Sequence, residues 1–140
     1  MVIAIDFDGT CVTHEFPKVG RDIGAAEVLR KLVNSGHQLI LYTMRSDRKE
    51  SKATGDPSIQ DVTGNFLSDA IKWFHDNRIP LYGIQENPTQ KNWTTSPKCY
   101  AELYIDDAAL GCPLLYSNKE RAYVNWAEIE VILRKNGIIK

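Results

Sequence analysis

The segment Asp6-Phe7-Asp8-Gly9-Thr10 places two carboxylates two residues apart, directly after a short apolar run. In an extended chain residues i and i+2 point to the same side, so Asp6 and Asp8 are expected to share one face. Carboxylates that close repel each other unless a proton or a cation lies between them. Mg²⁺ prefers oxygen ligands and is often held by one or two carboxylates. The spacing therefore favours a Mg²⁺ site over a solvated turn.

A second acidic pair, Asp106-Asp107, follows the apolar run 103–105. Adjacent acids at the end of a buried strand are costly without a cation. Ligands of parallel sheets bind beyond the carboxyl ends of the strands, where both acidic pairs would lie. The predicted metal ligands are therefore Asp6, Asp8, Asp106 and Asp107.

Alternating strands and helices must position these acids. Apolar runs predict strands at 2–5, 38–42, 81–84, 103–105 and 114–116, and helical periodicity predicts helices at about 22–34, 66–77 and 126–136. Glycines 36 and 137 are the expected helix stops, and Asn125 the expected N-cap of the last helix.

This alternation predicts a Rossmann-like three-layer α/β/α sandwich, with a parallel sheet of about five strands and helices on both faces. A chain of 140 residues fits a single core domain over 1–140, with a loop insertion near 44–61 and no cap domain. That loop could partly cover the site or be an excursion without a role.

Composition narrows the classes of partner and compartment. The net charge of −1 gives no positive field, which disfavours nucleic acid without excluding a local basic site. Three cysteines without a C-x-x-C spacing indicate a reducing, cytoplasmic setting. No apolar stretch approaches the roughly 18 residues that a membrane helix needs, and the first residues do not read as a signal peptide.

The segment from Asp6 to Thr10 resembles the first motif of the haloacid dehalogenase-like hydrolase superfamily. The resemblance implies that Asp6 is a nucleophile attacking phosphorus and that Asp8 is the general acid and base. It also implies that the backbone carbonyl of Asp8 binds the metal. Asp106-Asp107 is similar to the closing acidic motif, which implies Asp107 as a direct Mg²⁺ ligand and Asp106 as a ligand through water.

The other two motifs of that family are matched more loosely. Thr43, after the second predicted strand, resembles the hydroxyl that binds the transferring phosphoryl group, although threonine at a strand end is often only a β-former. The charge-offsetting lysine is expected to be Lys98, with Lys91 as the alternative. The expected substrate-binding residues are Gly9, Thr10, Met44 and Arg45.

The resulting prediction is an enzyme, a Mg²⁺-dependent phosphomonoester hydrolase that forms an aspartyl phosphate on Asp6. Its substrate would be a small phosphorylated metabolite, and a homo-oligomer could complete the uncapped pocket. One alternative is a phosphatase acting on the 3′-phosphate of nucleic-acid ends. Another is a receiver-like phospho-acceptor domain, which the order of acidic and hydroxyl residues along the chain disfavours.

Overall fold

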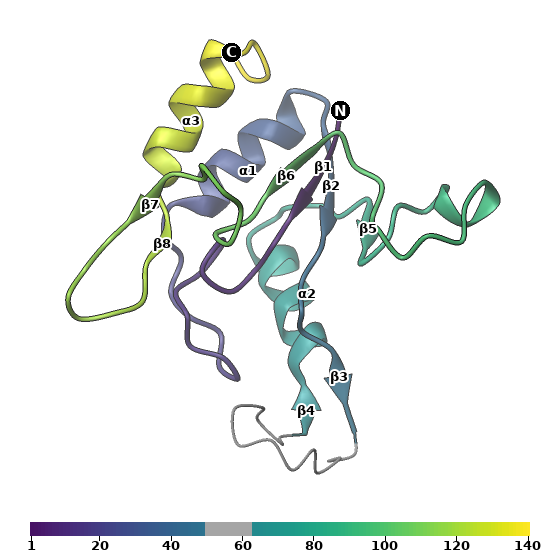
Figure 1. Cartoon of the computed structure of the whole chain (residues 1–140), viewed down its shortest axis with the longest axis horizontal. Coiled ribbons are helices and arrows are strands. Elements are labelled where there is room, and N and C mark those ends of the chain that lie inside the picture. The colour runs from purple at the N-terminus through teal and green to yellow at the C-terminus, as the bar shows by residue number, and fades with distance from the viewer. Residues whose placement is uncertain (50–62) are drawn as a thin grey trace.

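A computed structural model describes residues 1–49 and 63–140 (Figure 1). Its central sheet has four parallel strands in the order β5-β2-β1-β6. These strands are β1 (Val2–Ile5), β2 (Gln38–Leu41), β5 (Gly83–Ile84) and β6 (Leu103–Ile105). Ile5 pairs with Leu41 on one side and with Ile105 on the other, so three strands end at nearly the same level. The predicted α/β fold with a parallel sheet is confirmed.

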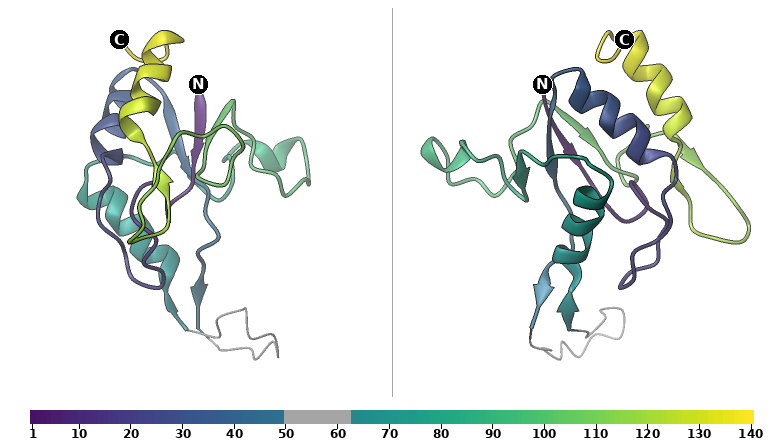
Figure 2. Two further views of the ribbon diagram at one scale, coloured as in Figure 1. Left: turned by 60° about the vertical axis from the view of Figure 1, so that its left-hand side comes forward. Right: turned by 180° about the vertical axis from the view of Figure 1, so that it is seen from behind.

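The three α-helices among the described residues cover the same face of the sheet (Figure 2). They are α1 (Ala25–Asn34), α2 (Phe66–Asp76) and α3 (Trp126–Lys135). Apolar residues from all three join Ile3, Ile5 and Leu39 in one buried cluster, as expected for amphipathic helices packed on a strand face.

The opposite face of the sheet is covered differently from the prediction. Among the described residues, it carries a small cluster of Ala4, Ile40 and Cys99 in place of a helical layer. The connection between β5 and β6 lies over it and contains one turn of 3₁₀ helix, η1 (Gln90–Asn92). The expected helices on both faces are therefore corrected to helices on one face, because the connection between β5 and β6 crosses the second face without forming an α-helix.

Two short antiparallel pairs flank the sheet. One joins β3 (Asp47–Arg48) to β4 (Gly64–Asn65), and the other joins β7 (Leu114–Leu115) to β8 (Tyr123–Val124). The strand predicted at 114–116 exists as β7, but it pairs with β8, so the main sheet has four strands and not about five. The predicted loop at 44–61 includes β3, and its part from residue 50 onward lies outside the described residues.

The helix ends follow the capping signals with one shift. Helix α1 begins at Ala25, later than predicted, because Oδ1 of Asp22 accepts N–H bonds from Gly24, Ala25 and Ala26 and so caps the helix from outside. Asn125 accepts the N–H of Glu128 over 3.2 Å and caps α3 as predicted.

The two predicted stops are also found. Gly36 and Gly137 have φ values of 89° and 70°, the left-handed conformation that ends α1 and α3. Within 1–49 and 63–140, no helix combines the length and the apolar character needed to cross a bilayer.

Candidate metal and phosphate site

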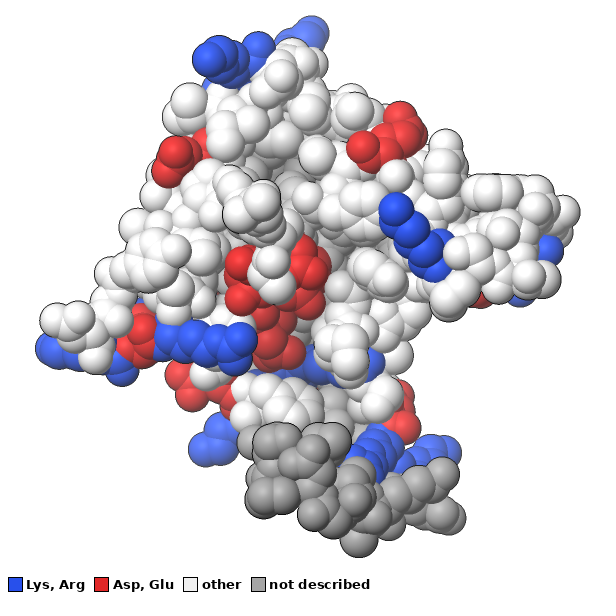
Figure 3. All heavy atoms as spheres, viewed as in Figure 1, with Lys and Arg blue, Asp and Glu red and all other residues white. Residues whose placement is uncertain are grey.

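Three carboxylates meet where β1 and β6 end. Asp6, Asp106 and Asp107 each offer one carboxylate oxygen, and these oxygens all lie within 4.8 Å of one another. Figure 3 shows acidic side chains gathered in a hollow near the middle of this face, over the ends of these strands. The pairing of Ile5 with Ile105 causes this meeting, because it brings the residues after both strands out side by side.

Thr10 and His14 hold these carboxylates in place. The buried hydroxyl of Thr10 lies 2.9 Å from Oδ2 of Asp6 and 3.3 Å from Oδ1 of Asp107, and accepts the N–H of Asp107 over 3.0 Å. Nε2 of His14 lies 3.1 Å from Oδ2 of Asp107. Thr10, predicted to bind substrate, is thus placed as a support for the acids.

The electrostatics of Asp6 fit a cation. Burial raises the pKa of this carboxyl to about 8, a hydrogen bond from the backbone of Phe7 opposes the rise, and the charge of Asp106 adds to it. A hard divalent ion would relieve both the repulsion and the lost hydration, and an all-oxygen donor set is what Mg²⁺ prefers. The residues present therefore fit the predicted metal, with Asp6, Asp106 and Asp107 as its side-chain ligands.

The carboxylate of Asp8 is bound by Arg45 and does not join this cluster. Its two carboxylate oxygens accept hydrogen bonds from Arg45, from Nε over 2.7 Å and from Nη2 over 2.8 Å. Its carboxylate is not one of the three that converge. The expectation that Asp8 also binds the metal can therefore apply only to its backbone carbonyl.

Arg45 does not have the role of substrate clamp that the sequence predicts. Its side chain is 1% exposed, and its remaining N–H groups donate to the carbonyls of Pro17, Lys18 and Phe66. The guanidinium carbon lies 5.0 and 5.2 Å from the ring centroids of Phe7 and Phe16. A guanidinium with every donor engaged cannot bind substrate, so its function is to hold Asp8 and the surrounding loops.

Thr43 and Met44 lie at the mouth of the acidic cluster. A cavity of about 170 Å³ is lined by Asp6, Tyr42, Thr43, Met44 and Asp106. The hydroxyl oxygen of Thr43 accepts the N–H of Arg45 over 3.1 Å, and Met44 is 97% exposed. Both residues are placed beside the acids, as a phosphoryl-binding segment would require.

The two candidate lysines, Lys98 and Lys91, lie outside the acidic cavity. Nζ of Lys98 lies 5.7 Å from the ring centroid of Tyr104, two residues before Asp106 on the chain. Lys91 is exposed within η1. Neither lysine lines the 170 Å³ cavity, and Lys98 is the one with a described contact to β6.

Position 9 must be glycine because a side chain there would collide with neighbouring residues. Its φ is +77°, and a Cβ at this position would lie 2.0 Å from Nε2 of His14 and 2.7 Å from Oδ2 of Asp107. Only glycine lets the loop after β1 pass this close to the carboxylates. Gly9 thus shapes the site through its lack of a side chain.

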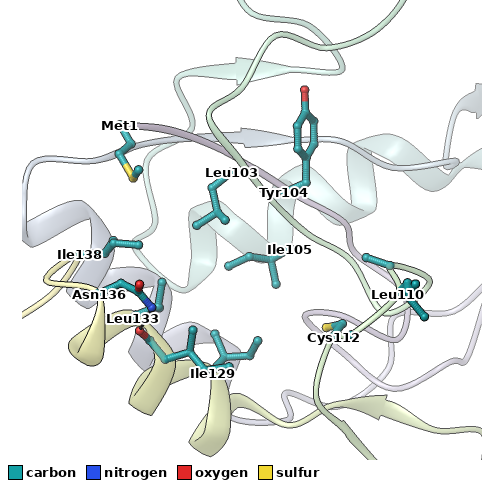
Figure 4. Close-up of a pocket in the computed structure, with 13 residues that line it drawn as sticks. Met1, Leu103, Tyr104, Ile105, Leu110, Cys112, Ile129, Leu133, Asn136 and Ile138 are labelled. Carbon is teal, nitrogen blue, oxygen red and sulfur yellow. Dashed lines mark hydrogen bonds between the residues drawn. The ribbon is translucent and has the colours of Figure 1, made fainter.

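A larger cavity of about 580 Å³ lies between the free edge of β6 and α3 (Figure 4). It is lined by Leu103, Ile105, Ile129 and Leu133 among others, and includes no Asp, Glu, Lys, Arg or His. This cavity therefore offers no carboxylate that could hold a metal ion, unlike the smaller cavity beside Asp6 and Asp106.

Two supporting residues were not predicted from the sequence. His14 reaches Asp107 across 93 positions of the chain, and no local pattern signals that contact. Gln85 donates to the carbonyls of Thr43 and Arg45 and accepts the N–H of Thr43, which fixes the loop after β2. The backbone of Gln85 has φ 66°, an uncommon conformation for a residue with a side chain.

Comparisons with known proteins give one informative match. The chain is similar to a solved structure described as a conserved protein of Bacteroides thetaiotaomicron, with a TM-score of 0.71 and 28% sequence identity. The match covers 97% of this chain and 91% of the other. No protein-family model matches the sequence. No curated protein matches it either.

Proposed function

We propose that this protein is a Mg²⁺-dependent phosphatase that hydrolyses phosphomonoesters through an aspartyl phosphate on Asp6. The observation that carries the proposal is the convergence of Asp6, Asp106 and Asp107 at the ends of neighbouring strands. Asp6 and Asp106 are 100 positions apart in the chain, and the repulsion among the three acids needs a compensating cation. A bound divalent ion would stabilise negative charge on the transferring phosphoryl group.

The nucleophile in this proposal is the carboxylate of Asp6. An Asp6 oxygen forms a bond to phosphorus while the bond from phosphorus to the leaving oxygen breaks, and Asp8 gives that oxygen a proton. Water then attacks the aspartyl phosphate, returns a proton to Asp8 and releases inorganic phosphate. A carboxylate nucleophile divides the hydrolysis into two easier steps.

Asp8 can keep both bonds to Arg45 while it acts as the acid. Each of its oxygens accepts one N–H bond from Arg45 in the structure, and each oxygen has a further lone pair. A proton can therefore be held on that free position and passed to the leaving oxygen, with Arg45 fixing the orientation of the carboxyl group.

Thr43 and Lys98 complete the proposed site. Thr43 borders the acidic cavity and would bind a phosphoryl oxygen through its hydroxyl, whose oxygen is already oriented by the N–H of Arg45. Lys98 would approach along Tyr104 to offset the charge of Asp6 and the phosphate. Lys91, on the outer turn of η1, is the less suitable alternative.

The cysteines support a cytoplasmic, reducing setting as part of the proposal. All three are free thiols, and Cys11 and Cys99 are buried. Burial raises the pKa of Cys11 well above its ordinary value, which leaves the thiol unreactive. Free cysteines without a disulfide partner are typical of reducing compartments.

A panel of phosphomonoesters with Mg²⁺ tests the proposal. The wild-type protein, Asp6→Asn and Asp8→Asn are compared, with Asp69→Asn on the exposed side of α2 as the matched control. Hydrolysis is expected for the wild type and the control, and a loss of at least about a hundredfold for each site variant. Full activity in Asp6→Asn, or turnover unaffected by a chelator, would refute the mechanism.

A further inference from the structure

A second pocket lies on the face of the sheet that the helices leave uncovered. It has a volume of about 340 Å³, within the usual range for small-molecule sites, and lies under the connection between β5 and β6. Trp93, Tyr100 and Tyr104 supply aromatic walls, and Lys98 lies beside them. Nothing in the proposed chemistry of Asp6 uses the aromatic walls of this pocket.

The pocket is built on two buried amides. Gln90, 4% exposed, donates to the carbonyls of Ser96 and Lys98 and accepts the N–H of Tyr100. Asn87, 3% exposed, donates to the carbonyl of Tyr100. Buried side chains that satisfy the backbone of an irregular loop fix its shape, so the loop presents its outer side chains in a preset arrangement.

The outer side chains of that loop are exposed aromatic rings. Trp93 is 58% exposed and Tyr100 47% exposed, and their ring centroids lie 5.3 Å apart in an edge-to-face arrangement. Large aromatic surface is costly to leave in water and is favourable for stacking against a planar ligand. Thr94 and Ser96 place hydroxyl groups along the same wall, which suits a ring with polar edges.

The pocket adjoins the acidic site. Tyr104 lines it and Asp106 lines the acidic cavity, and these residues are two apart on the chain, about 7 Å in an extended segment. Tyr104 points to the side of β6 away from Ile105, as Figure 4 shows. Lys98 lies over the Tyr104 ring, where its charge also favours an anionic ligand. This separation suits a phosphate and a ring that are joined through a sugar.

We propose that this pocket binds the base of a nucleoside monophosphate, free or at the end of a strand, while its phosphate reaches Asp6. The identification of the phosphate end rests on the function proposed above. The base would stack on the face of Trp93 with its edge against Tyr100, whose ring is perpendicular to that of Trp93, and its polar groups would meet Thr94 and Ser96.

Paired substrates test this specificity. Trp93→Ala is expected to lower kcat/KM for adenosine 5′-monophosphate by roughly 5- to 100-fold, the range for loss of one stacking contact. Tyr100→Ala, which removes the ring packed against Trp93, should lower it in the same direction. Hydrolysis of glycerol phosphate, which has no ring, should stay unchanged. Trp93→Phe should retain most activity because it keeps a stacking surface, and Tyr116→Ala, at an exposed tyrosine outside the pocket, is the matched control. Equal losses on both esters, or no loss on the nucleotide, would overturn the proposal.

A binding measurement separates this inference from the proposed chemistry. In Asp6→Asn, adenosine 5′-monophosphate should quench the fluorescence of Trp93, the exposed member of three tryptophans, and Trp93→Phe should abolish the quench. Quenching without turnover in the wild type would refute the phosphatase and keep the pocket. No quenching at millimolar nucleotide would refute the pocket.

A short oligonucleotide with a 3′-phosphate distinguishes the two forms of the ligand. If it is turned over faster than the mononucleotide and with a steep salt dependence, the substrate is the end of a strand. If it is turned over more slowly, the substrate is the free nucleotide.

Discussion

Arg45 donates two parallel hydrogen bonds to the carboxylate of Asp8, and its guanidinium is buried whereas the Asp8 side chain stays 20% exposed. The same guanidinium also donates to the backbone carbonyls of three other residues. One side chain therefore joins the loop after β1, the loop after β2 and the start of α2. The consequence is that the proposed acid and base is positioned by a residue that does not itself contact substrate.

Replacing Arg45 should damage stability and activity together. Arg45→Met leaves Asp8 without its partner and three carbonyls without donors, and loss of one partner of a buried pair costs about 3 to 5 kcal/mol. Urea denaturation would measure the change in the free energy of unfolding. Arg121→Met, at an exposed arginine, is the matched control and should change it by less than about 0.5 kcal/mol. A similar effect of both variants would show that Arg45 does not organise the site.

Mg²⁺ should stabilise the folded protein through the acidic cluster. An ion that binds only the folded state adds about 2.7 kcal/mol at a hundred times its Kd, which thermal unfolding with and without the ion would detect. Asp107→Asn should abolish this increment because it removes one of the three converging carboxylates. Asp69→Asn should keep it. An equal increment in Asp107→Asn would place the ion elsewhere.

The metal-free protein should lose stability as the pH rises from about 4 to about 8. The pKa of Asp6 is about 8 in the folded state against an ordinary 3.8, so over this interval the folded chain binds more protons than the unfolded chain. The stability due to this group is complete below pH 4 and is lost as the pH passes through 8. Asp6→Asn, which cannot ionise, should flatten the dependence and raise the unfolding midpoint most at pH 8. An unchanged pH profile in that variant would show that the dependence arises from another group.

Gly9→Ala should be more damaging than Gly111→Ala. Both glycines have positive φ values, 77° and 87°, so each substitution carries a backbone penalty of about 1 kcal/mol. A Cβ at Gly9 would collide with His14 and Asp107, whereas a Cβ at Gly111 would meet nothing within 4 Å. The difference between the two losses, expected at about 1 to 3 kcal/mol, measures the collision alone. Equal losses would show that the loop after β1 has room to move.

Much of the fold was predictable because its signals are local. Short apolar runs marked the four strands of the sheet, and Gly36, Asn125 and Gly137 marked helix ends through backbone conformations and caps that depend on neighbouring residues. The distribution of helices over the two faces was not predictable in this way. It depends on which side each connection crosses, and the segment 85–102 covers the second face with irregular structure.

The chemical types at the site could be read from the chain alone: carboxylates after two apolar strands, with a glycine and a threonine beside them. Their partners depend on the folded arrangement, because strand register brings Asp106 and Asp107 to Asp6, and loop packing turns Asp8 toward Arg45. Hydrogen bonds across tens of residues, such as those of His14 and Gln85, arise from the way the whole chain closes in space. Local spacing determines the chemistry that each side chain can offer. The tertiary packing determines which other groups that side chain contacts.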